Sequence, residues 1–331
     1  MRYLIIAILS LSTLFASAQQ KFERKLKLMG SSFTITVIAE NKDQADKHIK
    51  LAISEIQRIE KLISSWDENS ETSQINRMAG IRAVEVSEEL FSLIERCHVI
   101  SRITNGAFDI SFASIDHIWK FDGSMKTMPD SALVAQSVDK INYQNIILNK
   151  DNHSVFLKEK GMRIGFGAIG KVYAADKAKA HLIKAGSKAG IINASGDLTS
   201  WGKQPSGKAW TIGITNPLNK HRVFSWFPVD ERALVTSGDY ERFVELNGTR
   251  YSHIIDPRSG YPAHGLVSVT VFAPKAELAD ALATSIFVMG ADAGIHMVNQ
   301  LDEVDCVLVT ENGKILKSKN IELNTLNNAK D

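Results

Sequence analysis

The stretch Tyr251-Ser252-His253-Ile254-Ile255-Asp256-Pro257-Arg258-Ser259-Gly260 constrains this chain most, because it predicts an apolar strand that carries a histidine and runs into a tight turn. Asp-Pro-x-x-Gly is typical of a β-turn, since proline fixes φ and glycine tolerates positive φ. The turn accounts for Asp256, Pro257 and Gly260 but not for His253. His253 can have either a structural or a functional role, and this stretch alone does not decide between the two.

A second polar pair lies further along the chain, in a segment that predicts a helix over residues 276–289. Asp280 and Thr284 are four residues apart and so share one helical face. The surrounding residues are apolar almost all round, which predicts burial, and a buried carboxylate needs a partner. A hydrogen-bonded structural aspartate is one interpretation. A Mg²⁺ site is the other, and it explains both oxygens, because hard cations take carboxylate, hydroxyl and carbonyl ligands.

Residues 165–172 read Gly-Phe-Gly-Ala-Ile-Gly-Lys-Val and contain parts of two phosphate-binding motifs. They match G-x-G-x-x-G and nearly match G-x-x-x-x-G-K-[ST], which both place backbone amides and a helix N-terminus around phosphates. Val172 replaces the hydroxyl of the second motif, and the acidic partner of the first is missing. A plain glycine-rich turn and an anion-binding loop of neither type stay open. Lys171 opposes the dipole of the helix predicted to begin here, which favours a phosphate nearby.

Weaker signals come from aromatic and small polar residues at predicted turns. Phe108 next to Asp109, and Trp66 in an acidic loop, suit a flat heteroaromatic ligand that packs on a ring and donates to a carboxylate. A simple turn explains each equally well. Residues 193–197 and 236–240 place small polar groups at strand ends, where backbone amides can meet phosphate or sugar groups, with tight turns as the alternative.

The remaining pattern predicts an α+β chain with mixed or antiparallel sheets packed against helices, because strands and helices alternate without a regular βαβ rhythm. Helices are predicted over 41–64, 87–103, 170–185 and 276–289. Strands are predicted over 32–39, 146–148, 155–157, 190–194, 210–214, 232–236, 243–246, 251–255, 266–272 and 306–310, with the last closing the sheet.

Composition and the N-terminus narrow the functional class. The chain has 331 residues and a formal net charge of only +2, with no basic run, so nucleic acid is not an expected partner. Residues 1–18 have a positive start, a short apolar run and an Ala-x-Ala end, which predicts a secretory signal peptide and an exported mature protein. Cys97 and Cys306 lie in apolar patterns, which favours buried thiols over a disulfide.

Taken in order, these motifs resemble the ApbE family of FAD:protein FMN transferases over about residues 27–315, nearly the whole mature chain. No single motif is specific, but the ordered set is. The segments that carry the resemblance are 29–33, 65–66, 73–76, 106–110, 118–121, 170–176, 195–197, 236–240, 253–260 and 279–284.

The resemblance implies an ApbE-like, T-fold-related architecture over residues 19–331, as a single domain or as two α/β lobes with FAD between them. It implies that FAD and Mg²⁺ bind, and that FMN is attached through a phosphodiester to a Ser or Thr of a target protein with release of AMP. It also implies membrane redox subunits with a flavinylation motif as acceptors, and a location in the periplasm or at the outer face of the cytoplasmic membrane.

Site residues follow from the same resemblance. His253 matches a histidine beside the phosphates. The implied metal positions are Asp280, Thr284, Ala283 and the carbonyl of Ala168, and the implied FAD contacts are Met29, Trp66, Ala107, Phe108, Asp109, Lys171 and Ile255.

The chain departs from the family pattern at four positions and leaves three questions open. Gly165 stands where Asp is frequent, Ser195 and Val172 where Gly is frequent, and Trp66 where Tyr is frequent. Either His253 or Asp280 could accept the proton of the attacking hydroxyl. Water could also attack instead, which would make the protein an FAD pyrophosphatase. A further alternative to the transferase is an exported flavin-binding protein without catalysis.

Overall fold

The fold is seen in a computed structural model, which describes residues 19–116, 118–216, 219–229, 231–240 and 242–322. For residues 215–216 and 219–224 it describes the backbone but not the side chains. The predicted signal peptide therefore lies outside the described residues. Within the described ranges, no helix has both the length and the apolar character needed to span a bilayer.

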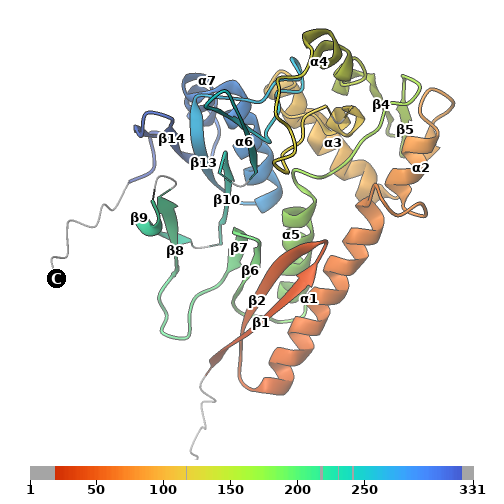
Figure 1. Cartoon of the computed structure of the whole chain (residues 1–331). Coiled ribbons are helices and arrows are strands. Elements are labelled where there is room, and N and C mark those ends of the chain that lie inside the picture. Colours follow the sequence, from red (N-terminus) through yellow and green to blue (C-terminus); the bar gives the residue numbers. More distant parts are fainter. Residues whose placement is uncertain (1–18, 117, 217–218, 230, 241, 323–331) are drawn as a thin grey trace, which may run out of the picture.

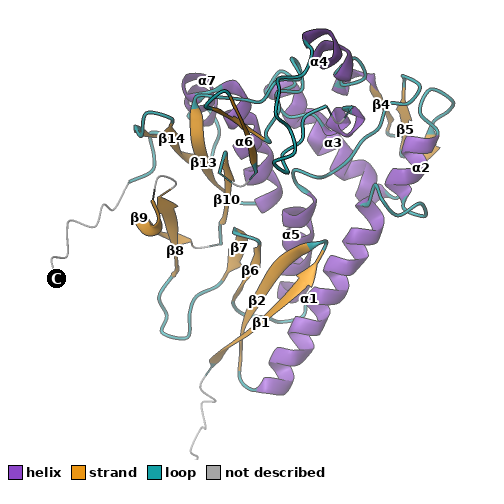
Figure 2. Ribbon diagram, viewed as in Figure 1, coloured by secondary structure: helices purple, strands orange, loops and turns teal. Residues whose placement is uncertain are grey.

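The main sheet has eight strands, and every pairing in it is antiparallel (Figures 1 and 2). In spatial order the strands are β1 (Gln20–Leu28), β2 (Ser31–Ala39), β6 (Gly190–Ala194), β7 (Asp197–Trp201), β10 (Ala233–Gly238), β13 (Leu266–Ala273), β14 (Asp305–Thr310) and β15 (Ile315–Lys317).

Smaller sheets and the helices complete the α+β fold that the sequence predicts. The smaller sheets are β3 (Val84–Glu85), β5 (Ser154–Leu157) and β4 (Ile146–Asn149), the ribbon of β8 (Trp210–Asn216) and β9 (Asn219–Val229), and the ribbon of β11 (Phe243–Leu246) and β12 (Thr249–Ser252). The helices are α1 (Lys42–Ile63), α2 (Glu71–Arg77), α3 (Glu88–Ile103), α4 (Ser131–Ser137), α5 (Gly170–Lys184), α6 (Ala276–Met289) and α7 (Ala291–Val298), with short 3₁₀ turns η1 (Ile110–Ser114) and η2 (Tyr143–Asn145).

Strand alternation explains how the sheet buries both faces. Neighbouring residues of a strand point to opposite sides. In β10, Val235 packs into the core under α6, while Leu234 packs into the core under the β8–β9 ribbon. In β13, Val271 and Phe272 divide in the same way. Helices α5 and α6 cover one face, and α1 packs along α5 (Figure 1).

Two strand predictions need correction. β12 ends at Ser252, so His253 lies just after the strand and not within it, because Ile254 and Ile255 turn away and Ile255 pairs with Pro262 in an isolated bridge. β14 does not close the sheet, because β15 pairs with its outer side. Cys97 and Cys306 are free and buried, as predicted.

Gly190 gives a stability prediction. A Cβ at this position would lie 2.4 Å from the Thr36 carbonyl oxygen and 2.4 Å from the Trp201 ring. Gly190→Ala therefore overpacks β6, and we expect the free energy of unfolding to fall by about 1–3 kcal/mol in urea titrations. Gly167→Ala is the matched control, because a Cβ there meets nothing within 4 Å. Equal stability of both variants would contradict the packing.

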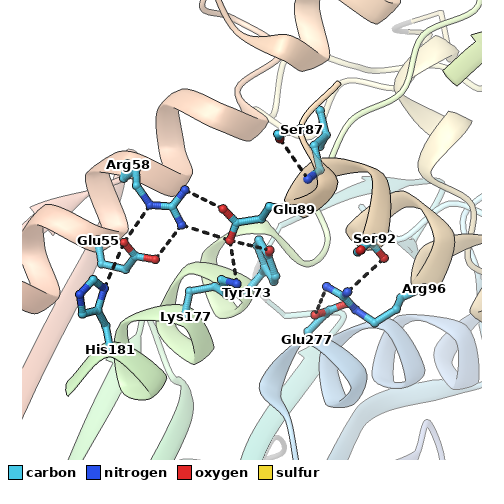
Figure 3. A network of polar contacts seen from close by, with 11 residues as sticks. Glu55, Arg58, Ser87, Glu89, Ser92, Arg96, Tyr173, Lys177, His181 and Glu277 are labelled. Atoms are coloured by element: carbon cyan, nitrogen blue, oxygen red, sulfur yellow. Dashed lines mark hydrogen bonds and ion pairs between the residues drawn. The ribbon is translucent and has the colours of Figure 1, made fainter. Parts of the chain in front are cut away.

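A network of charges joins α1, α3 and α5 (Figure 3). Arg58 of α1 donates to Glu55 and, at 2.6 Å, to Glu89 of α3, which also pairs with Lys177 of α5 at 2.7 Å. Burial opposes ionisation of Glu89, but the hydrogen bonds from Arg58 and Lys177 prevail and lower its pKa from 4.5 to about 2. The stability from this carboxylate is therefore present above about pH 4.5 and is lost as the pH falls toward 2.

The pH dependence of unfolding tests this network. Between pH 7 and pH 3 we expect the free energy of unfolding of the wild type to fall more than that of Glu89→Gln, because the variant has no carboxylate to protonate at this position. Denaturant titrations at both pH values measure the difference. Parallel losses in the two proteins would show that the network does not hold Glu89 ionised.

Candidate active site

A cavity of about 430 Å³ lies between one end of the central strands β7 and β10, helices α5 and α6, and the segment 107–113. Most of the residues singled out from the sequence line it. The predicted residues in its wall are Trp66, Ala107, Phe108, Asp109, Ala168, Lys171, His253, Ile255, Asp280 and Thr284. Segments far apart in the sequence thus converge on one cavity.

Helix α6 contributes a carboxylate and a hydroxyl to the cavity wall. Asp280 is only 7% exposed, and Thr284 lies one turn later on the same face. On the opposite face of α6, Leu282 packs into one apolar cluster with Val269 and Val271 of β13. This packing holds the two oxygens at a fixed place, as the i, i+4 spacing predicts.

The N-terminus of α5 forms the neighbouring wall. Gly167, Ala168, Ile169 and Lys171 line the cavity, and α5 begins at Gly170 without a side-chain cap. Uncapped helical amides carry a partial positive charge, which stabilises anions. Within the described part of the chain Lys171 makes no ion pair, so its ammonium can add to that charge. This geometry is compatible with an anion-binding loop, which stays a prediction.

The Asp109 carboxylate accepts hydrogen bonds from neighbouring segments of this chain. Its Oδ1 accepts the amide and the hydroxyl of Ser111, both at 2.7 Å, and its Oδ2 accepts the Tyr143 amide at 2.7 Å. Burial raises the pKa of Asp109, and these hydrogen bonds oppose the rise. Asp109 thereby fixes the loop that presents Ala107 and Phe108 to the cavity. Its direct contact with a ligand stays a prediction.

Trp66 is a large aromatic side chain at the cavity with 88% of its surface exposed. Its loop is held by Ser64, whose hydroxyl accepts the amides of Trp66 and Asp67 at 3.2 and 3.0 Å. An exposed indole on an ordered loop offers a stacking face for a planar ring.

His253 follows β12 directly, and a backbone carbonyl orients it. The carbonyl oxygen of Arg242 lies 3.1 Å from His253 Nδ1 and also accepts the His253 amide at 3.0 Å. A carbonyl can only accept, so Nδ1 carries the hydrogen of this bond and the neutral ring has its lone pair on Nε2. The Phe121 ring meets the imidazole edge-on, with centroids 6.5 Å apart.

Some cavity residues were absent from the predicted set. Asp197 and Thr236 lie on neighbouring strands, and Asp197 Oδ1 accepts the Thr236 amide at 3.1 Å. Ser237 and Gly238 line the cavity beside them. The signal was present as small polar residues at strand ends, but it could not be separated from ordinary turns.

Two predicted residues do not line the cavity. Met29 packs against the apolar core, with its Cε 3.9 Å from where a Cβ on Gly170 would stand. Ala283 is fully buried on α6, so its methyl group belongs to the core. Gly165 does line the cavity, and a Cβ there would lie 3.0 Å from the Ala113 methyl group, so the space beside it is narrow.

The cavity wall offers a carboxylate and a hydroxyl group, from Asp280 and Thr284, as donors for a metal ion. Among the described residues no three His, Cys, Asp or Glu side chains form a cluster that could enclose a metal. Mg²⁺ does not need such a cluster, because it often binds one or two carboxylates and completes its shell with water and phosphate oxygens. Asp280 and Thr284, beside an uncapped helix that favours phosphate, fit such a site.

Comparison with known proteins identifies the family. The family model described as "ApbE family" matches residues 29–308. The chain belongs to the ApbE family. An ApbE relative named FAD:protein FMN transferase, from Klebsiella pneumoniae, is 31% identical over 293 residues, covering 88% of this chain and 90% of the relative. A relative of the same name from Treponema pallidum is 29% identical and covers 80% and 78%.

Solved ApbE structures share the fold. The crystal structure of the ApbE protein of Thermotoga maritima has a TM-score of 0.81 and 31% identity, covering 91% of this chain and 97% of that one. The apo form of the Pseudomonas stutzeri flavinyl transferase ApbE has a TM-score of 0.79 at 22% identity, covering 91% and 95%, and it supports the fold alone. The ApbE-like α+β architecture expected from the sequence is thereby confirmed.

Proposed function

We propose that this protein transfers FMN from FAD, with Mg²⁺, through a phosphodiester to a Ser or Thr of another protein and releases AMP. One observation carries the proposal. A single cavity unites an exposed indole, an uncapped helix N-terminus with Lys171, the oxygens of Asp280 and Thr284, and an oriented His253. The names of the ApbE relatives support the same reaction.

Asp280, Thr284 and the Ala168 carbonyl would hold the Mg²⁺ ion. When bound, Mg²⁺ supplies charge neutralisation on a pyrophosphate and on the phosphate that leaves. The chain's own cationic groups act on the same charge, because Lys171 and the α5 amides face the cavity. We assign FAD binding to the predicted contacts in the cavity wall, with the Trp66 indole as a stacking face, and we retain Met29 and Ala283 as predictions.

The reaction requires a proton acceptor. The hydroxyl oxygen of the acceptor protein attacks the phosphorus on the flavin side, the bond from that phosphorus to the AMP oxygen breaks, and the hydroxyl proton is lost. His253 Nε2 can take this proton, because the Arg242 carbonyl holds the hydrogen on Nδ1. If Asp280 binds a cation, its carboxylate oxygens are engaged and are less able to accept a proton. This favours His253 as the base.

The cellular setting is part of the same proposal. The N-terminal sequence supports export, either to the periplasm or to the outer face of the cytoplasmic membrane. Membrane redox subunits with a Ser/Thr flavinylation motif would be the acceptors. FAD pyrophosphatase activity is the alternative reaction, since water could take the place of the acceptor hydroxyl in an open cavity.

Isotope labelling separates transfer from hydrolysis. The protein is incubated with FAD, Mg²⁺ and an acceptor in water enriched in oxygen-18, and the nucleotides are separated and weighed. Transfer predicts unlabelled AMP in amounts equal to modified acceptor. Hydrolysis predicts free FMN or AMP that carries oxygen-18, without modified acceptor. Unchanged FAD would contradict both reactions and leave a flavin-binding protein.

A further inference from the structure

We infer that Asp176 of α5 is a positioning residue that caps α6 and thereby fixes Asp280 and Thr284 relative to Lys171. The inference rests on the proposed function, because the proposed function assigns Mg²⁺ binding to Asp280 and Thr284 and the neutralisation of phosphate charge to Lys171. The observation itself is a hydrogen bond between two helices that both line the cavity.

The start of α6 lacks a cap of its own. Its N-cap residue, Lys275, makes no side-chain hydrogen bond to the helix. Asp176 supplies the missing acceptor, because its Oδ2 accepts the Glu277 amide at 3.0 Å. Aspartate is among the preferred capping residues, although the cap here comes from another helix. Burial raises the pKa of Asp176 to about 6, as expected for an enclosed carboxyl group.

This bond joins two short helical segments that end at the cavity. Lys171 lies five residues before Asp176, or about 7.5 Å along the axis of α5. Asp280 lies three residues after Glu277, or about 4.5 Å along α6. Because each segment is rigid, the Asp176 bond sets the distance between the lysine and the α6 oxygens. A change of one residue in the register of α6 would rotate Asp280 by about 100° around the helix.

A second contact acts on the same residue. The Glu277 carboxylate pairs with Arg96 of α3 through Nε at 2.7 Å and Nη2 at 3.0 Å (Figure 3). Glu277 is 5% exposed and so the carboxylate of this bidentate pair is shielded from water, whereas the Arg96 side chain is 40% exposed. The backbone of Glu277 is thus held by α5 and its side chain by α3. Asp176 therefore holds the backbone at the start of α6 in place, whereas Arg96 holds only the Glu277 side chain.

The test compares variants that keep or remove the acceptor oxygen. Asp176→Ala removes the cap, whereas Asp176→Asn keeps an oxygen that can accept the Glu277 amide. Asp130→Ala is the matched control, because Asp130 caps α4 through the Ala132 amide at 2.8 Å and lies outside the cavity wall. FAD binding is measured by flavin fluorescence at increasing Mg²⁺ concentration, without any acceptor.

We expect Asp176→Ala to raise the Mg²⁺ concentration for half-maximal FAD binding by about tenfold, the lower end of losses seen for residues that orient metal ligands. Asp176→Asn should stay within about twofold of the wild type, which is the rescue that a positioning role requires. Asp130→Ala should not shift the curve. If Asp176→Ala does not fold, Asp176→Glu replaces it, since the extra methylene displaces the carboxylate while keeping its charge.

A readout without ligand separates this inference from the proposed function. Amide hydrogen exchange of the segment 275–282 should be faster in Asp176→Ala than in the wild type and in Asp176→Asn, because the Glu277 amide loses its acceptor. Unchanged exchange, or an unchanged Mg²⁺ curve in a wild type that does need Mg²⁺, would overturn the inference. A wild type whose FAD binding ignores Mg²⁺ would instead contradict the proposed function.

Discussion

Replacing Asp280 by alanine is expected to lower FMN transfer by about 10³-fold, the effect of losing several kcal/mol of charge stabilisation at the leaving phosphate. The reason is local, because Asp280 is the buried carboxylate of the cavity wall on α6. FAD binding by the variant should also cease to respond to Mg²⁺. Transfer rates and flavin fluorescence titrations at several Mg²⁺ concentrations measure both effects.

The matched control is Asp292→Ala, which removes an exposed carboxylate from the first turn of α7. This variant should transfer FMN at the wild-type rate, with the wild-type dependence on Mg²⁺. Circular dichroism shows whether each variant is folded. A folded Asp280→Ala that works at full rate with Mg²⁺ would remove the carboxylate from the metal site.

The second large effect is expected at His253. His253→Ala should bind FAD with nearly the wild-type affinity but transfer FMN about 10²- to 10³-fold more slowly, because general-base catalysis contributes an effect of this size. The lost group is an imidazole whose Nε2 is kept as an acceptor by the Arg242 carbonyl. Single-turnover transfer with saturating FAD isolates the chemical step from binding.

His264→Ala controls for the loss of a nearby imidazole, since His264 is exposed and lies outside the cavity wall. We expect wild-type transfer from this variant. Unchanged transfer by His253→Ala would leave Asp280 as the base. A variant that no longer binds FAD would assign His253 to binding and not to proton transfer.

The sequence predicted α1, α3, α5 and α6 but not the shorter helices α2, α4 and α7. The ends of α1, α3 and α5 carry local signals. Asn41 caps α1 through the Gln44 amide, Ser87 caps α3 through the Leu90 amide, and Gly186 follows α5 with a φ of +87°. Such signals act over a few residues and can be read without knowing the fold. The spacing of Asp280 and Thr284 is equally local, so their shared face followed from helical geometry alone.

The features of the site that could not be predicted depend on contacts between segments far apart in the sequence. The bond from Asp197 to the Thr236 amide joins strands whose pairing no local pattern predicts. The same holds for the Arg242 carbonyl that orients His253, and for Asp176 at the start of α6. β1 is a charged edge strand with only alternate residues partly covered, so its sequence alone did not predict it.

The most direct test of the central claim is the mass of an acceptor protein after incubation with residues 19–331 of this protein, FAD and Mg²⁺. The account predicts a mass gain equal to one FMN moiety on a Ser or Thr of the flavinylation motif, with an equal amount of AMP released. It also predicts that neither product forms with Asp280→Ala or without Mg²⁺. An acceptor of unchanged mass, although FAD binds to the protein, would contradict the account.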